Sequence, residues 1–256
     1  MLRKRLRLIA VPVAAVALPL TVAGSQASAS AVPASVGAAS SGKAAAALSG
    51  KAATATAPCL ADATTLVGDL DGDSRPDKIT NPGLTGTRMT VQWGAANGAF
   101  GKKHAVSALL GAKKGEVASA AVADFQRDGS LDMVVNLVTP ADGDDPSTAR
   151  VAEYRPGPLK RSNLGSAHSR HSDIGDHGEV RQLRIANYGG DAYPDLAILN
   201  NAGDGQLDRD VRLTKPGRGP GNYDYQLQVK YGQFGTTSEP PSMPADGWKH
   251  FYKPCS

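Results

Sequence analysis

The sequence predicts an all-β fold that is built from repeats. Three segments share one pattern, in which a short apolar strand, a nine-residue acidic turn and a second apolar strand follow one another. The turns occupy residues 69–77, 124–132 and 187–195, so they start 55 and 63 residues apart, a period that suits four short strands per unit. Past residue 58 the only sustained helical pattern is a short one at residues 106–114.

Further strand signals lie between and after the turns. Residues 89–93 have the pattern of a strand that leads into Asn97-Gly98, a pair typical of a tight hairpin turn. Residues 200–205 occupy the matching place in the third unit. Residues 223–231 alternate between aromatic or aliphatic and polar side chains, which predicts another strand. The expected units run over about residues 59–118, 119–180 and 181–256.

The first part of the chain has the pattern of an export signal. Residues 1–31 begin with four basic residues, continue with an apolar stretch over residues 8–20 and end in small residues, with Ala29 and Ala31 as candidate cleavage sites. The apolar stretch would reach about 20 Å of a hydrocarbon core about 30 Å thick, so we expect no membrane span. Residues 32–58, rich in Ala and Ser and without aromatics, are predicted to form a disordered spacer. We therefore expect an extracellular protein.

The distribution of charge argues against a nucleic-acid partner. The whole chain has 28 basic and 24 acidic residues and a pI near 9.0, which by itself would suggest a polyanion. No acidic residue precedes Asp62, whereas six basic residues precede Cys59. Residues 59–256 consequently hold 22 basic and 24 acidic residues, and the excess positive charge belongs to the export segment. We expect no nucleic acid among the partners.

The two cysteines of the chain, Cys59 and Cys255, stand at the two ends of the predicted domain. Export would place them where disulfides persist, and two cysteines allow a single intramolecular pairing. A reactive thiol or an intermolecular link is the alternative, but no histidine pattern typical of a catalytic cysteine supports it. We therefore predict a disulfide, which requires the start and the end of the fold to meet.

The three acidic turns are candidate calcium sites. Calcium takes six to eight oxygen ligands, and carboxylates at alternate positions of a tight loop can converge on one ion. The four carboxylates of the first turn would repel one another without a cation. The pattern weakens at Gln126 in the second turn and at Gly189 in the third, and a solvated hairpin turn is the alternative for each. An EF-hand is excluded, because its sixth and twelfth positions would fall on Ser74 and Thr80.

The strand, acidic turn and strand of these units resemble the FG-GAP/VCBS repeats, which build integrin-α-like β-propellers and occur in many secreted bacterial proteins. The resemblance covers about residues 60–215. It implies a β-propeller-like architecture of about three four-stranded units, hence an incomplete or small propeller, because closed propellers usually have four to eight blades. A short closed propeller, an open stack capped by residues 218–255 and assembly with another chain all fit this count.

The resemblance also implies that each turn binds Ca²⁺ through side-chain and backbone oxygens. Taken by position, the implied ligands are Asp69, Asp71, Asp73, the carbonyl of Arg75 and Asp77 in the first turn, Asp124, Gln126, Asp128, the carbonyl of Ser130 and Asp132 in the second, and Asn187, Asp191, the carbonyl of Tyr193 and Asp195 in the third.

The evidence for an enzyme is limited to one loop. The sequence has no nucleophile elbow, no phosphate-binding P-loop and no H-E-x-x-H motif. Imidazole and carboxylate groups between the second and third units could bind zinc and hold a nucleophilic water, with a polar surface loop as the alternative. These residues are His168, His171, Asp173, Asp176 and His177.

Two roles are open for the aromatic residues Trp93, Trp248, Phe251 and Tyr252, which could stack on a sugar or peptide or could pack into the core. Taken together, the sequence favours a secreted, calcium-binding module without catalysis that binds an extracellular protein or a glycan. A secreted metal-dependent hydrolase that uses the histidine loop and a structural accessory protein are the alternatives.

Overall fold

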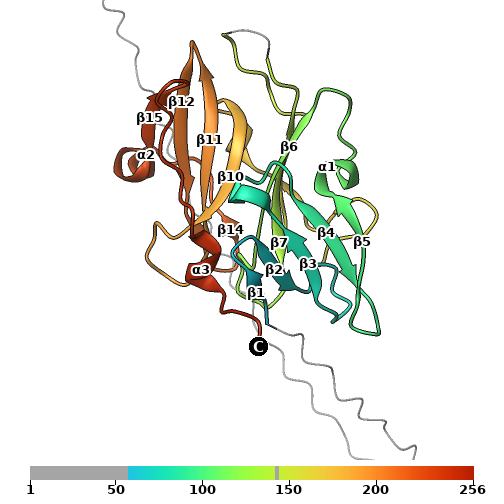
Figure 1. The fold of residues 1–256 in the computed structure, drawn as a ribbon. Helices are drawn as coiled ribbons and strands as arrows, with labels where there is room; N and C mark the ends of the chain where they lie inside the picture. Colours follow the sequence, from blue (N-terminus) through green and yellow to red (C-terminus); the bar gives the residue numbers. More distant parts are fainter. Residues whose placement is uncertain (1–56, 142–143) are drawn as a thin grey trace, which may run out of the picture. The chain divides into compact units, whose positions relative to one another are not determined.

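The computed structural model describes residues 57–141 and 144–256. The predicted export signal and the predicted spacer up to residue 56 lie outside the described residues. The described chain forms three antiparallel sheets of four or five strands, a two-stranded ribbon and only short helices (Figure 1). Three successive sheets of this kind make a propeller-like, all-β architecture, which confirms the predicted fold class.

The first sheet follows the order of the chain, so that each strand pairs with the next. Leu66, Ile79 and Val91 on its three central strands are fully buried. The predicted hairpin turn joins its last two strands, and Gly98 has the positive φ of 77° that favours glycine there. The strands are β1 (Cys59–Asp62), β2 (Thr65–Gly68), β3 (Asp77–Thr80), β4 (Thr90–Gly94) and β5 (Phe100–Ala105). The short helices η1 (Pro82–Leu84) and α1 (Val106–Leu109) accompany them, and α1 starts the predicted helical stretch.

The second and third sheets repeat this arrangement. Strands β6 and β7 are buried on both faces along almost their whole length, which explains why their sequences are mostly apolar without alternation. The second sheet consists of β6 (Val117–Ala123), β7 (Asp132–Val138), β8 (Val151–Arg155) and β9 (Arg170–His171), followed by η2 (Asp173–Gly175). The third consists of β10 (Glu179–Ala186), β11 (Asp195–Gly203), β12 (Gln206–Arg212) and β15 (Gln233–Thr236). The ribbon pairs β13 (Thr214–Lys215) with β14 (Gly219–Pro220).

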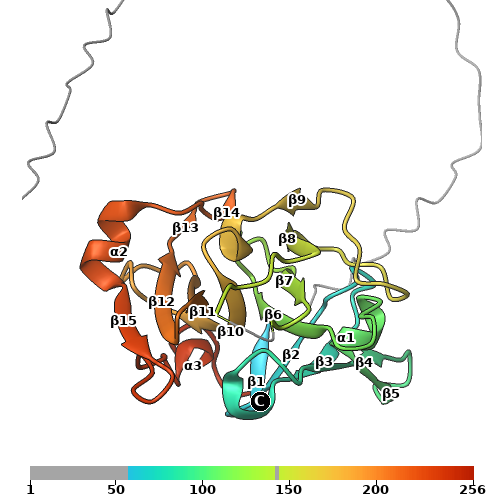
Figure 2. The same ribbon diagram turned by 90° about the horizontal axis from the view of Figure 1, so that it is seen from above.

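The loop after β3 joins all three sheets. Strands β6 and β10 pack against each other, and Figure 2 shows the sheets around this contact. Ala120 N of β6 donates to Gly86 O (3.0 Å), and Leu183 N of β10 donates to Thr85 O (3.2 Å). Gly86 has a φ of 78°, and a Cβ there would overlap the carbonyl oxygens of Ala120 and Leu183. Only glycine fits this junction.

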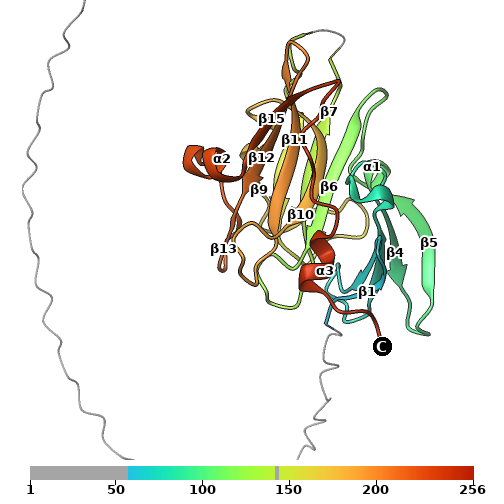
Figure 3. The same ribbon diagram turned by 60° about the vertical axis from the view of Figure 1, so that its left-hand side comes forward.

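The C-terminal segment closes the fold from the other end of the chain. Helix α3 (Gly247–Phe251) packs on β10, and the chain then runs beside β1 (Figure 3). Trp248 is 3% exposed and its Nε1 donates to Val122 O of β6 (2.8 Å), so its role is core packing. Trp93, at 9% exposed, also belongs to the core.

The disulfide between Cys59 and Cys255 is present, as predicted, with the two Cα atoms 5.0 Å apart. Two hydrogen bonds of 2.8 Å support it, from Leu60 N to Lys253 O and from Cys255 N to Leu60 O. The start and the end of the described domain are therefore joined both covalently and through the backbone.

The strand predicted at residues 223–231 is wrong, because this segment forms helix α2 (Tyr225–Tyr231). The carboxylate of Asp224 caps the helix by accepting hydrogen bonds from two backbone N–H groups of its first turn. The amide of Gln228 exchanges two hydrogen bonds of 2.9 Å with the backbone of Val211 in β12. The helix thus covers the end of β12 near Val211, whereas β15 pairs with the earlier residues of that strand. None of the helices in the described ranges has the length and apolarity needed to cross a membrane.

Candidate metal centre

The first turn connects β2 to β3 and wraps around the carboxylate of Asp69. That carboxylate accepts hydrogen bonds from Gly72 N (2.7 Å) and Ser74 N (2.8 Å). Both donors have positive φ, 78° and 63°, which curls the backbone around the side chain. Asp71 and Asp73 each accept a bond from the backbone N–H two residues later, which sets their side chains in Asx turns.

Three carboxylates of the first turn converge. Asp69, Asp71 and Asp77 each offer one oxygen, and these oxygens lie within 4.8 Å of one another. In the described part of the chain this is the only such group of three or more His, Cys, Asp or Glu residues. Three hard oxygen ligands at this spacing fit a cation such as Ca²⁺. The structure therefore brings together three of the four predicted side-chain ligands of this turn and leaves the carboxylate of Asp73 outside the group.

The last aspartate of each turn has the same place in all three sheets. Asp77 accepts from Leu70 N (3.0 Å) and from Gly94 N of β4 (2.8 Å). Asp132 and Asp195 make the matching pairs of hydrogen bonds, with the second residue of their own turn and with the backbone beyond the third strand. All three carboxylates are buried. Each therefore ties its turn to its sheet in addition to any role as a ligand.

Burial has a measurable consequence for these carboxyls. It raises the pKa of Asp77 to about 6 and the pKa of Asp132 to about 6, although backbone hydrogen bonds oppose the shift in both cases. Burial also raises the pKa of Asp195. A bound cation favours the ionised form and would offset this cost of burial.

The second turn is held by hydrogen bonds more than by convergence of carboxylates. Asp124 accepts from the backbone N–H groups of Asp128 and Gly129 (both 3.0 Å). Asp128 accepts from Ser130 N (2.9 Å), and the side chain of Gln126 donates outward to a backbone carbonyl of the ribbon. The predicted ligands of this turn lie on one loop, but its described carboxylates do not form a group as close as that of the first turn.

The third turn contains a hydrogen-bond acceptor that has no hydrogen-bond donor within the described ranges. The Oδ1 atom of Asn187 is buried and has no hydrogen-bond partner. Asp191 Oδ2 and Asp195 Oδ2 face the space beside Gly189, while Tyr193 N donates to Asp191 Oδ1 (2.8 Å). A cation would satisfy the unpaired oxygen of Asn187, and the same turn also supplies the carboxylates of Asp191 and Asp195.

A basic side chain from the second sheet reaches the first turn. The guanidinium of Arg161 pairs with Asp71 and with Asp73 (2.5 Å), and it lies 5.6 Å from the centre of the Trp93 ring. These contacts raise the pKa of Arg161, mainly through the hydrogen bond to Asp71. No signal in the sequence indicated this contact, because Arg161 lies 90 residues from Asp71.

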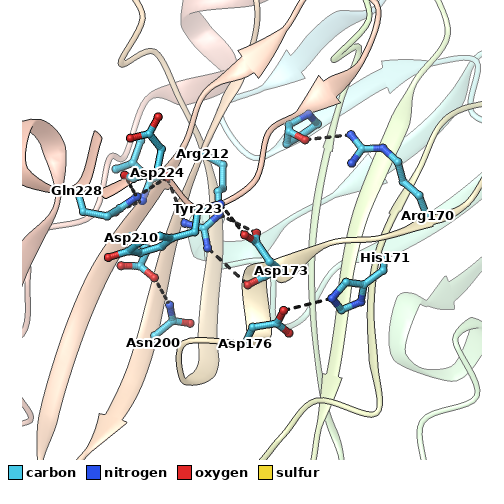
Figure 4. A network of polar contacts seen from close by, with 12 residues as sticks. Arg170, His171, Asp173, Asp176, Asn200, Asp210, Arg212, Tyr223, Asp224 and Gln228 are labelled. Atoms are coloured by element: carbon cyan, nitrogen blue, oxygen red, sulfur yellow. Dashed lines mark hydrogen bonds and ion pairs between the residues drawn. The ribbon is translucent and has the colours of Figure 1, made fainter. Parts of the chain in front are cut away.

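The histidine loop does not assemble a metal site. His171 Nε2 lies 3.3 Å from Asp176 Oδ2, and both side chains are exposed (Figure 4). Asp173 instead accepts from the fully buried guanidinium of Arg212, with Nε and Oδ1 3.0 Å apart. Asp173 is therefore the counter-charge of a buried arginine.

The other two histidines of this loop point elsewhere. The ring of His177 stacks on Tyr223 with the centroids 4.2 Å apart, and His168 lines a separate cavity beside the ribbon. The five residues proposed for zinc chemistry thus take part in four different sets of contacts. The observed arrangement is the polar loop that the sequence left as the alternative.

One known family model matches the chain. Residues 69–135, about a quarter of the chain, match the model of the FG-GAP-like repeat. The matched segment runs from the first acidic turn through the second turn into β7, so the family model covers two of the three turns. The third turn lies outside it. Neither the curated proteins nor the solved structures compared with the chain include a match.

Proposed function

We propose that this protein is a secreted, calcium-binding β-repeat module that binds an extracellular protein or a glycan and does not catalyse a reaction. The observation that carries the proposal is the convergence of Asp69, Asp71 and Asp77 within a segment that matches the FG-GAP-like repeat. Calcium is the cation of choice because all three ligands are carboxylates and neither histidine nor cysteine joins them.

Secretion and the absence of catalysis have separate support. The export signal expected at residues 1–31 and the disulfide at the ends of the domain agree with an oxidising location. The residues of the histidine loop serve other contacts, chiefly the pair between Asp173 and Arg212, which removes the main argument for a hydrolase. Peptide sequencing of the exported protein tests secretion, and a start after Ala29 or Ala31 is expected.

A calcium titration tests the metal centre. We expect calorimetry on chelator-treated protein to show binding, and calcium to raise the melting temperature, since a ligand that binds only the folded state stabilises it by about 2.7 kcal/mol at a hundredfold excess over Kd. The variant Asp71→Asn should lose the tightest site, because it removes one of the three converging carboxylates.

The matched control is Asp73→Asn, which removes an acid two residues away that the structure places outside the group. It should keep the tight site. If the two variants bind calcium equally, or if the chelated protein binds none and melts unchanged, the proposal for this turn fails.

A further inference from the structure

A basic cavity lies between the second sheet and the ribbon, away from the converging carboxylates of the first turn. Its volume is about 540 Å³, within the range of small-molecule sites. Its wall includes Arg170, Lys215, Arg218 and His168 and contains no aspartate or glutamate. This is unexpected, because residues 59–256 as a whole hold slightly more acidic than basic residues.

The positive charges of this cavity are not neutralised by neighbouring acids. Among the described residues, no carboxylate lies within ion-pair distance of Arg170, Lys215 or Arg218. Arg150, Arg155, Arg161, Arg181 and Arg212 have such a partner, whereas Arg127, Arg184 and Arg209 also lack one in the described part of the chain, so the distinctive feature of the cavity is that unpaired cations gather around one space. The cavity thus gathers cations that the fold leaves without counter-charge, and this pattern selects an anionic ligand.

The wall of the cavity is also held in place. The guanidinium of Arg170 donates from Nη2 to Arg218 O (2.5 Å) and Pro220 O (3.0 Å), which anchors the ribbon (Figure 4). It lies 4.7 Å from the centre of the Tyr154 ring, and Tyr154 is itself fixed by a hydrogen bond to Asp132. These hydrogen bonds use only Nη2, so Nε and Nη1 of Arg170 have no hydrogen-bond acceptor among the described residues.

The remainder of the wall indicates what the neutral part of the ligand is. Gln126 and Asn222 contribute amides, three glycines contribute backbone, and no aliphatic side chain other than proline lines the space. Such a surface suits hydroxyl groups better than hydrocarbon. The cavity is also larger than one inorganic anion requires.

We propose that this cavity binds an acidic sugar unit, a carbohydrate of mono- to disaccharide size that carries carboxylate or sulfate groups. The proposal rests on the binding role proposed above and deepens it by naming the ligand class, and its residues lie outside the converging carboxylates of the first turn. Arg170 and the exposed Lys215 and Arg218 would contact the anionic groups, and the amides would contact the hydroxyls.

The test is calorimetry on the whole protein with four probes. These are a disaccharide with one carboxylate and one sulfate, the neutral parent disaccharide, inorganic sulfate and a glutamate-rich peptide. We expect the acidic disaccharide to bind, the neutral one not to bind, and the affinity to fall as salt is raised. Equal or better binding of inorganic sulfate or of the peptide overturns the sugar assignment, as does no binding of the acidic disaccharide.

Variants locate the site. The double variant Lys215→Glu/Arg218→Glu should weaken binding at least tenfold, and the milder Lys215→Gln/Arg218→Gln should weaken it less, with melting temperatures recorded for both. The matched control is Lys102→Glu/Lys103→Glu, which makes the same charge change on the exposed strand β5. Binding unaffected by the first variant, or equally affected by the control, refutes the proposal.

The variant Asp71→Asn separates the two sites. It should lose tight calcium binding and keep the binding of the acidic disaccharide. Failure of the sugar assay therefore does not affect the calcium result, and failure of the calcium assay does not affect the sugar result.

Discussion

Replacement of Arg161 should tighten calcium binding at the first turn. Its guanidinium pairs with Asp71 and Asp73, so an ion that binds Asp71 must displace or tolerate a positive charge. The side chain of Arg161 is 42% exposed, and surface pairs of this kind contribute about 0.2–1 kcal/mol each, or about 1 kcal/mol for the two. A guanidinium about 6 Å from a divalent ion in water adds a repulsion of about 1 kcal/mol.

The two contributions add to about 2 kcal/mol, which corresponds to about a thirtyfold change in affinity. We therefore expect Arg161→Gln to bind calcium about ten- to thirtyfold more tightly in calorimetry. The same variant should be about 1 kcal/mol less stable than the wild type in chelator, measured by chemical denaturation. In the presence of calcium, Arg161→Gln should instead be more stable than the wild type.

The control for this prediction is Arg150→Gln, which removes a guanidinium that pairs with Glu116. It should leave the calcium affinity unchanged. A calcium affinity of Arg161→Gln that equals or falls below that of the wild type would refute the reasoning, because it would mean that Arg161 holds Asp71 in place for the ion and does not compete with it.

Three further outcomes follow from the structure. The pKa of Asp77 and of Asp132 is raised from 3.8 to about 6 in the folded protein, so protonation of these carboxyls stabilises the protein without calcium below pH 4. This stability is lost as the pH rises through 6, by at most about 3 kcal/mol per group. Chemical denaturation in chelator should show the loss, and added calcium should abolish it. Trp248→Phe removes the donor to a buried carbonyl and should cost about 1–3 kcal/mol in denaturation, with calcium affinity unchanged. Serine at both Cys59 and Cys255 should cost about 5 kcal/mol, because the bridge closes a loop with a sequence separation of 196; an unchanged midpoint would contradict this.

The acidic turns could be predicted from the sequence because their geometry is local. In the first turn, nine residues with aspartate at the first, third and last positions fold around their own backbone N–H groups, as Asp69 does with Gly72 and Ser74. What the sequence could not show is the second function of the last aspartate. Asp77 also accepts from Gly94, which lies 17 residues away, and that contact depends on the path of a later strand.

The error at residues 223–231 has a similar origin. Alternation of apolar and polar side chains predicts a strand only where a sheet edge is available to pair with it. Here the backbone of Val211 at the end of β12 bonds with the amide of Gln228, and β15 takes the pairing with the earlier part of β12. The capping residue Asp224 was a local signal for the helix that the alternation obscured.

The nearly neutral domain separates its charges by a topological rule. In the second and third sheets, the segment after the third strand reaches back to the acidic turn of the preceding sheet. After β8 this segment brings Arg161 to the first turn, and after β12 the ribbon meets the second turn where Gln126 donates to Gly217 O (3.2 Å). The segment after β8 forms ion pairs with the first turn. Lys215 and Arg218 of the ribbon, in contrast, have no carboxylate partner among the described residues. The same connection therefore yields an internal counter-ion for one turn and a cationic cavity beside the next, and of these two connections only the second leaves its cations without an ion pair and able to bind a ligand.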